Sequence, residues 1–435
     1  MDLSLILFVG IGALLVLFML GIPVFISFLL LNISFVFYAF GQAGFGLFAN
    51  SVFASTTSST LASIPMFILM GEVLFRSGTV EVLLDSTDRL IGRVKGRQYY
   101  LTVALATVFG ALSGSAVAVA GVLGRALVPG MLQRNYDEKL TLGTVLAGAS
   151  LAPIIPPSIA VIIIGSLVDT SIAKLLVGGI LPGLFLAGLF VLYIAFRSSV
   201  SPGLLPEATS ANEGPNKVSV FRALARLLPF SIVIFSVVGL ILLGVATPSE
   251  SAATGVMASF VVAAWYRKLS FVMVIEAVKA TASMAVVILV IMASSQLFSQ
   301  LLAFTGGTRE LVDALTNLGA GYWTTLALLM FVPFVLCMFI DQIALMLVII
   351  PIYLPIVNSY GYDQTWFWML FLINLTVGSI TPPFGYTLFA LRAAVPDISV
   401  TRVFSSAWPF VALFVAGITV IAVFPAIVTF LPSLM

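Results

Sequence analysis

The chain of 435 residues is 61% hydrophobic and only 8% charged, and its mean hydropathy is +1.20. An ordinary soluble domain is roughly a quarter charged, so this composition predicts an integral membrane protein. The chain has no histidine and one cysteine, Cys337, which excludes Ser-His nucleophile pairs, His-ligated metals and intrachain disulfides. A net charge of +2 gives no argument for a nucleic-acid partner.

The apolar stretches predict membrane helices, because they run about 20 residues without the alternation of barrel strands. The first begins at residue 3 and lacks the basic start of a cleavable signal peptide. A polar stretch rich in Pro, Gly and Ser, 198–217, predicts a linker between two halves, 1–197 and 218–435. The apolar stretches are 3–20, 22–40, 60–75, 101–132, 141–168, 172–196, 227–246, 251–266, 281–305, 321–357, 365–395 and 403–432.

The two halves show the pattern of an internal repeat. Matched prolines and a matched Tyr-Asp pair are harder to obtain by chance than matched apolar residues. A shift of 226 places Pro129 on Pro355, Tyr136-Asp137 on Tyr362-Asp363 and Pro156-Pro157 on Pro382-Pro383, and a shift of 229 places Phe75, Gly78, Thr79 and Glu81 on Phe304, Gly307, Thr308 and Glu310.

The distribution of Lys and Arg predicts the orientation of the repeats. With both termini outside, sixteen of the nineteen basic residues lie inside, Lys174 and Arg309 lie outside, and Arg125 lies within a membrane hairpin. The opposite orientation would place most basic residues outside, against the rule that Lys and Arg are in excess on the cytoplasmic side. The first half then begins outside and the second begins inside, so the repeats are predicted to be inverted.

Two apolar stretches, 101–132 and 321–357, are too long for one crossing of about 20 residues. Each has a polar interruption, Ser113-Gly114-Ser115 in the first and Asp341-Gln342 in the second. The repeat shift places Ser115 on Asp341. We therefore predict two re-entrant hairpins that enter from opposite sides and have equivalent tips.

The strongest local signal is a Pro-Pro pair inside each of two membrane helices, at Pro156-Pro157 and Pro382-Pro383. Consecutive prolines remove backbone donors and break the helix, which leaves carbonyls without partners. A single pair could be only a structural kink. Two pairs at equivalent inverted positions are typical of a secondary transporter with discontinuous helices at the membrane midplane.

Six segments resemble the large membrane subunit of TRAP transporters, the DctM/SiaM type, and together they extend over nearly the whole chain. They are SIPMFILMGEVLFRSG from Ser63, ALSGSAVAV from Ala111, PIIPPSIAVIIIGSLVDTSIAKL from Pro153, ATPSESAATG from Ala246, FIDQIALMLVIIPIYLPI from Phe339 and LTVGSITPPFGYTLFAL from Leu375.

The resemblance implies an all-α inverted-repeat elevator-type secondary transporter with two re-entrant hairpins and two broken helices. It implies sodium-driven uptake of an organic acid anion across the bacterial inner membrane. Together with the charge distribution, this places both termini in the periplasm. The implied partners are a periplasmic substrate-binding protein and a small four-helix membrane subunit of the DctQ/SiaQ type, with lipid around them. Segments 79–95 and 269–280 resemble the arm helices of such an elevator.

The resemblance also implies the binding of two or more sodium ions. One would lie between Asp341 and the second break, and a buried carboxylate suits the charge of the ion. The alternative role for Asp341 is a helix cap. The family often has an Asp where this chain has Val119, and a Pro where it has Gln342. The implied ligands are Asp341, Gly378, Thr381 and Pro383 for one site, and Ser113, Ser115, Ala152, Ile155 and Pro157 for the other.

An anionic substrate would suit the free N–H groups where helices restart after the breaks, at Ser158 and at Phe384-Gly385. Arg125 could pair with a substrate carboxylate. Its alternative role is an arginine whose side chain reaches toward the cytoplasm.

Other charged residues are predicted to have structural roles. Glu72 and Arg76 have the spacing of a local ion pair, and Glu250 follows Thr247-Pro248-Ser249 as part of a helix cap. Asp169 and Lys174 are predicted to be loop charges.

Three other functions compete with the transporter subunit. A stand-alone sodium-coupled carboxylate carrier of the same architecture stays open, and an ion channel would differ in turnover rate. An intramembrane serine enzyme lacks both a histidine and a lysine at membrane depth. No nucleotide-binding GxxxxGK[ST] loop is present, so ATP does not drive this chain directly.

Overall fold

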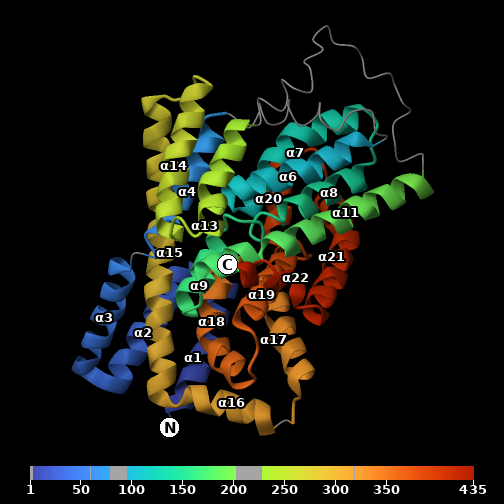
Figure 1. Cartoon of the computed structure of the whole chain (residues 1–435). Helices are drawn as coiled ribbons and strands as arrows, with labels where there is room; N and C mark the ends of the chain where they lie inside the picture. The colour runs from blue at the N-terminus through green and yellow to red at the C-terminus, as the bar shows by residue number, and fades with distance from the viewer. Residues whose placement is uncertain (1–2, 59, 79–95, 202–227, 318) are drawn as a thin grey trace.

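The structure, a computed structural model, describes residues 3–58, 60–78, 96–201, 228–317 and 319–435, and their regular secondary structure is helical (Figure 1). Five helical segments in these residues are long and apolar enough to cross a membrane. The first half contains α1 (Leu3–Met19), α2 (Val24–Phe40), α3 (Gly44–Thr57), α4 (Ser63–Arg76), α6 (Arg97–Ser113), α7 (Ala116–Gln133), α8 (Glu138–Ala149), α9 (Ile159–Leu167), α10 (Ile172–Gly178) and α11 (Ile180–Val200).

Within the described residues, the second half begins with helical residues 228–234, which lead into a π-helical turn (Phe235–Gly239) and then into α13 (Leu240–Leu242). The remaining helices are α14 (Pro248–Trp265), α15 (Phe271–Thr305), α16 (Gly307–Asn317), α17 (Tyr322–Cys337), α18 (Gln342–Ser359), α19 (Gln364–Ser379), α20 (Tyr386–Ala394), α21 (Val400–Val423) and α22 (Ala426–Thr429). The predicted arm 79–95 and residues 202–217 of the predicted linker lie outside the described residues.

The two predicted hairpins are confirmed. α6 and α7 turn at 114–115, and α17 and α18 turn at 338–341. Figure 1 shows these hairpins approaching the middle of the molecule from opposite ends. Both predicted helix breaks are confirmed as well, because α8 is separated from α9 and α19 from α20 by non-helical residues that contain the Pro-Pro pairs. The same order of hairpin and broken helix therefore occurs twice, in opposite orientation.

The helices form two groups that lie side by side (Figure 1). The first group, here called the scaffold group, contains α2, α3 and α4, which pack against the long helix α15, and α14, which packs against α4. The second group, here called the hairpin group, contains both hairpins, both broken helices, α11 and α21. α15 is 35 residues long and packs against α18 as well as against the scaffold helices, so it forms the boundary between the groups.

Two elements differ from the sequence-based prediction. Segment 269–280 is not a separate arm, because α15 runs without interruption from Phe271 to Thr305. The helix that lies crosswise is α16, which joins the end of α15 to the second hairpin (Figure 1). α3 was not predicted at all, because its serines and threonines interrupt the apolar pattern. Ser51 and Ser55 instead donate to backbone carbonyls four residues earlier, which lets these polar residues lie inside a buried helix face.

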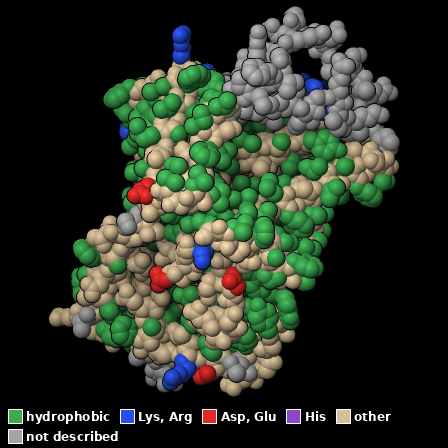
Figure 2. All heavy atoms as spheres, viewed as in Figure 1, with side chains coloured by type: hydrophobic (Ala, Val, Ile, Leu, Met, Phe, Trp, Pro, Cys, Tyr) green, Lys and Arg blue, Asp and Glu red, His purple; other side chains and the backbone are tan. Residues whose placement is uncertain are grey.

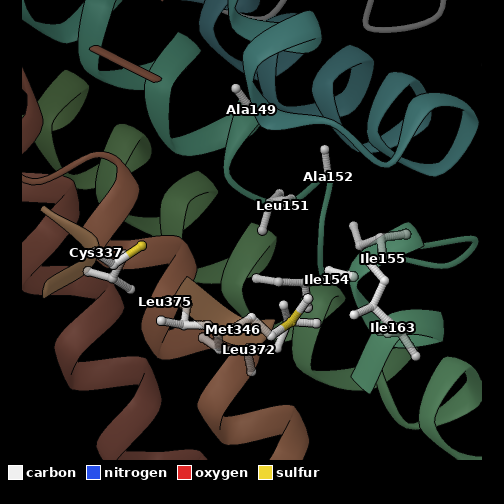
Figure 3. Close-up of a cluster of buried hydrophobic side chains, with 14 of the residues drawn as sticks. Ala149, Leu151, Ala152, Ile154, Ile155, Ile163, Cys337, Met346, Leu372 and Leu375 are labelled. Atoms are coloured by element: carbon white, nitrogen blue, oxygen red, sulfur yellow. The ribbon is translucent and has the colours of Figure 1, made fainter. Parts of the chain in front are cut away.

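The apolar core runs through both halves of the chain. Figure 3 shows side chains from the first break, among them Ile154, in one cluster with Met346 of α18 and Leu372 of α19. Cys337 is fully buried in this cluster, where it packs as a small apolar residue. The outer face in Figure 2 shows broad hydrophobic areas with few charged side chains, which suits a surface in contact with lipid.

One hydrogen bond crosses between α15 and the second hairpin. Pro351 has no N–H, so it cannot pair with the carbonyl of Leu347 one turn earlier in α18. The buried hydroxyl of Ser295 on α15 donates to that carbonyl instead, at 2.5 Å. Inside the scaffold group, Asn32 on α2 donates to the neighbouring carbonyl of Ser294 at 2.8 Å.

Candidate functional site

The first hairpin tip is held by backbone geometry and two serine hydroxyls. Gly114 has a φ of +63°, which a side chain rarely permits, and it lets α6 turn sharply into α7. The Ser115 hydroxyl caps α7 by accepting from the N–H of Ala118 at 3.3 Å, and the Ser113 hydroxyl accepts from the N–H of Ser115. No side chain in the described tip carries a charge.

The first tip lies directly on the first break. A Cβ placed on Gly114 would lie 3.4 Å from the carbonyl oxygen of Pro157 and from the N–H nitrogen of Ile159. Gly110 approaches the break even more closely, since its Cβ would lie 2.8 Å from the Cα of Ala152. The carbonyl of Pro157 and the backbone around Ala152 are therefore close to the tip that carries Ser113 and Ser115. Ile155 is buried, and its side chain packs against Gly183 of α11.

The second hairpin tip carries a carboxylate. Oδ1 of Asp341 caps α18 by accepting from the N–H groups of Ile343 (3.0 Å) and Ala344 (3.2 Å). The role of Asp341 as a helix cap is therefore observed, and the side chain is nevertheless accessible from the cavity described below. A carboxylate that both caps a helix and faces a cavity can still accept a cation.

Gln342, which sequence reasoning noted only as a departure from the family pattern, joins the second tip to both halves of the second broken helix. Its side chain is 3% exposed. Nε2 donates to the Thr376 hydroxyl on α19 at 3.1 Å, and Oε1 accepts from the Tyr386 hydroxyl on α20 at 3.0 Å. The Thr376 hydroxyl donates its single hydrogen to the carbonyl of Leu372, so it can only accept from Gln342. The group of the Gln342 amide that faces Thr376 must therefore be the NH₂ group.

The second break has the same close packing as the first, with the small residue on the other element. A Cβ on Gly378 would lie 2.7 Å from the Cβ of Cys337 and 2.9 Å from the carbonyl of Phe334, so only glycine fits against α17. The buried Thr381 hydroxyl donates to the carbonyl of Val377 at 2.7 Å. Both Pro-Pro bonds, Pro156-Pro157 and Pro382-Pro383, are cis. Pro383 is exposed and does not line the cavity.

The two tips meet at one cavity of about 430 Å³, here called the tip cavity. The polar side chains that line it include Ser113, Ser115 and Asp341, so the structure brings together predicted residues from both halves. The first residues of α9 and α20 also reach it, which places two helix N-termini at its wall. Its lining includes residues 113–118 and 341–344 of the tips, Pro153, Ile159, Ala160 and Tyr386 of the broken helices, Glu72 of α4 and Ser283 of α15.

The predicted substrate residues do not all face this cavity. Ser158 is fully buried, because its hydroxyl donates to the carbonyl of Pro153 and accepts from the N–H of Val161. Gly385 is buried, and its Cβ would collide with the carbonyl of Ser379 at 2.5 Å. Phe384 is 56% exposed, and its ring lies 5.5 Å from that of Phe339, centroid to centroid.

Arg125 is exposed on α7 and lines a groove of about 710 Å³ that adjoins the tip cavity. The two spaces share Glu72, Phe75, Val117 and Ala118. The predicted ion pair of Glu72 and Arg76 is present at 2.6 Å, and Thr247 and Glu250 form a capping box at the start of α14. In the described part of the chain, no group of three or more acidic, Cys or His side chains could hold a metal ion by itself. A cation here would need backbone and hydroxyl oxygens.

Residues 11–427 match the protein family described as "Tripartite ATP-independent periplasmic transporter, DctM component". The chain belongs to this family. It is 30% identical over 425 residues to the ectoine TRAP transporter large permease protein TeaC of Halomonas elongata, which covers 96% of this chain and 97% of TeaC.

A second relative is the sialic acid TRAP transporter permease protein SiaT of Haemophilus influenzae. It is 29% identical, and the match covers 88% of this chain and 61% of SiaT. Among solved structures, the YdaH transporter of Alcanivorax borkumensis superposes with a TM-score of 0.57 at 16% identity, covering 87% of this chain and 88% of YdaH. This last likeness concerns the fold alone. The chain is thus a multi-pass membrane protein of the large TRAP permease type, and its relatives are permeases.

Proposed function

We propose that this permease imports an organic acid anion together with sodium ions. The observation that carries the proposal is the tip cavity, where the carboxylate of Asp341, the hydroxyls of Ser113 and Ser115 and the N-termini of α9 and α20 converge from inverted repeats. Oxygen ligands suit Na⁺, and helix N-termini suit a carboxylate. The names of the two relatives contain ectoine and sialic acid, and each of these molecules carries one carboxylate.

The sodium sites would differ between the two tips. At the second tip, Asp341 would supply the charge, with backbone oxygens near Gly378, Thr381 and Pro383. At the first, Ser113 and Ser115 would act with carbonyls of Ala152, Ile155 and Pro157, and the contact between Gly114 and the Pro157 carbonyl supports that grouping. Two sodium ions entering at roughly 150 mV would supply about 7 kcal/mol, which is enough to concentrate a dilute substrate.

Movement would follow an elevator mechanism. The two helix groups lie side by side, and α16 lies crosswise between α15 and the second hairpin (Figure 1). Such a connection would let the hairpin group move along the scaffold group while the hairpins keep hold of the cargo. The tip cavity adjoins the groove along α7, which would provide a path to the cytoplasm in this conformation.

The partners and the orientation follow from the family and the charge distribution. A periplasmic binding protein would deliver the substrate, and a small membrane subunit would accompany the permease. Both termini would face the periplasm of a bacterial inner membrane. The turn that joins α14 to α15 lies at the end of the molecule opposite the N-terminus (Figure 1), and its sequence contains Arg267 and Lys268, as the positive-inside rule would require for this orientation.

The test is uptake in proteoliposomes that contain the permease and the small membrane subunit, with the binding protein outside. A panel of labelled organic acids is tested with inward Na⁺ or K⁺ gradients. Uptake that needs both Na⁺ and the binding protein is the expected result. Sodium-dependent uptake without the binding protein would instead establish a stand-alone carrier, and uptake that ignores the sodium gradient would overturn the proposal.

A further inference from the structure

The start of α20 lies at the wall of the tip cavity and has no side-chain cap. Gly385, which precedes the helix, makes no capping hydrogen bond through a side chain, and Tyr386, the first residue of α20, lines the cavity. The start of α9 differs, because the Ser158 hydroxyl caps it by accepting from the N–H of Val161. The placement of the first turn of α20 therefore depends on contacts with other elements.

Two hydroxyl groups hold the first turn of α20. Thr387 donates to the hydroxyl of Ser379, across the break of the second broken helix, at 3.3 Å. Tyr386 donates to Oε1 of Gln342, in the second hairpin tip, at 3.0 Å. The first contact stays within the broken helix, whereas the second makes the start of α20 depend on the position of the tip.

Gln342 and Asp341 belong to the same turn at the start of α18. Oδ1 of Asp341 accepts from the N–H groups of Ile343 and Ala344, so the carboxylate is fixed to this turn. Gln342, the first residue of α18, is 3% exposed, and its Nε2 also donates to Thr376 on α19. Hydrogen bonds that are buried away from water hold their groups firmly in position. A change in the position of the carboxylate is therefore passed to the Gln342 amide.

The first repeat lacks the groups that this connection needs. The shift of 226 places Ala116 on Gln342 and Ala160 on Tyr386, and neither alanine has a polar side chain. The connection through an amide therefore occurs at the tip that carries the carboxylate, and not at the tip that carries serine hydroxyls.

We propose that Gln342 is a positioning residue that couples ion binding at Asp341 to the placement of the α20 N-terminus. The inference rests on the proposed function, because it takes a sodium ion at Asp341 from there. An ion that orders the first turn of α18 also orders the Gln342 amide and, through Tyr386, the start of α20. The N–H groups that would receive a substrate carboxylate are then in place when the ion is bound. By linkage, the ion and the substrate would each raise the affinity of the other by the same factor.

The experiment measures backbone hydrogen exchange of the purified permease complex in sodium chloride and in potassium chloride at equal ionic strength. Two segments are followed, the second tip at 338–344 and the start of α20 at 384–390. In the wild-type protein, sodium should slow exchange at both segments, because bound ion opposes local opening. Slower exchange at the tip alone would overturn this inference and leave sodium binding intact. No sodium effect at either segment would overturn sodium binding at Asp341 and this inference with it.

Tyr386→Phe and Thr376→Val are matched variants, because each removes one of the two hydrogen bonds of the Gln342 amide. In Tyr386→Phe, the sodium effect at the tip should remain, while that at α20 should be lost or reduced about tenfold. In Thr376→Val, sodium should still slow exchange at both segments, since the bond to Tyr386 is intact. A merely structural role would change both variants alike, so equal sodium effects at α20 in the two variants would overturn the inference.

Gln342→Leu should behave as Tyr386→Phe does at α20 and retain the sodium effect at the tip, because Asp341 is unchanged. A general loss of stability would speed exchange in both salts and leave the sodium effect at each segment as it was. The start of α9, at 159–165, is the internal control, since Ser158 caps it independently of Gln342. Wild-type sodium effects at both segments in Gln342→Leu, together with sodium-dependent uptake, would overturn this inference and support the proposed function.

Discussion

The two hairpin tips have the same backbone arrangement but different side-chain chemistry. The first tip contacts its broken helix through Gly110 and Gly114, where backbone meets backbone, and its polar groups are serine hydroxyls. The second tip carries Asp341 and is tied to both halves of its broken helix by Gln342. The position equivalent to Gln342 in the first tip is Ala116, which can form no such bonds.

The difference shows that the two repeats share their backbone packing but not the charge at their tips. Close packing requires glycine where backbones meet, and both repeats satisfy it, at Gly110 in one and Gly378 in the other. A charged side chain, Asp341, occurs at the second tip and has no counterpart at the first. The comparison implies that a sodium ion at the second tip would be bound through charge, whereas one at the first would depend on the geometry of neutral oxygens.

Replacement of Asp341 by Asn should have the largest effect on transport. The carbonyl of Asn can still cap α18, but the charge that would offset the ion is gone. Uptake at low sodium should fall at least tenfold, about 1.4 kcal/mol or more in free energy, with normal expression. Uptake as a function of sodium concentration in proteoliposomes measures this, and an unchanged sodium dependence would refute the assignment.

Gly378→Ala should have the largest effect on stability. The new Cβ would lie 2.9 Å from the Phe334 carbonyl, which belongs to the backbone and cannot rotate away. We expect a loss of about 3 kcal/mol, seen as a lower melting temperature of the purified protein. Gly188→Ala in α11 is the control, because its Cβ meets nothing within 4 Å. Equal melting of the two variants would contradict the packing argument.

Gln342→Leu would make the second tip more like the first. It leaves the Tyr386 hydroxyl without its acceptor, at an expected cost of about 2 kcal/mol. Tyr386→Phe and Thr376→Val each remove one end of the connection and should each cost less than Gln342→Leu. Thermal melting of the three variants tests this order, and wild-type stability of Gln342→Leu would show that the connection contributes nothing.

Ser115→Ala should give the smallest effect. It removes the hydroxyl that caps α7 through the N–H of Ala118, which is worth about 1 kcal/mol. If neutral oxygens bind sodium at the first tip, the variant should also reduce the apparent affinity for sodium less than Asp341→Asn does. A larger loss than in Asp341→Asn would reverse the comparison between the tips.

Much of the architecture could be predicted from the sequence, because its signals are local. The hairpins follow from stretches too long to cross once, and the breaks follow from Pro-Pro pairs that no helix accommodates. The crosswise helix α16 could also have been predicted from the sequence. The shift that matches Gly78 and Glu81 with Gly307 and Glu310 places the counterpart of the predicted arm 79–95 at α16, whereas segment 269–280 has no such counterpart.

The side-chain partners at the site could not be predicted in the same way. The sequence shows that Gln342 follows Asp341, but Thr376 and Tyr386 become its partners only through the packing of α18 against the second broken helix. Ser158 is a second example. The sequence predicts free N–H groups at this helix start, but it does not show that the Ser158 hydroxyl donates to the carbonyl of Pro153. Tertiary contacts thus decided which polar groups face the cavity, and a linear pattern does not contain them.

Pro351 has a consequence for how the second hairpin meets α15. A helix normally hides its carbonyls from neighbouring elements, but this proline leaves the Leu347 carbonyl open to a donor on another helix, here Ser295. Any sliding of α18 along α15 would therefore exchange one hydrogen bond, worth about 1 kcal/mol net, and would leave the internal hydrogen bonds of both helices intact. This hydrogen bond between α15 and α18 is specific in direction and inexpensive to break, as the proposed elevator movement would require.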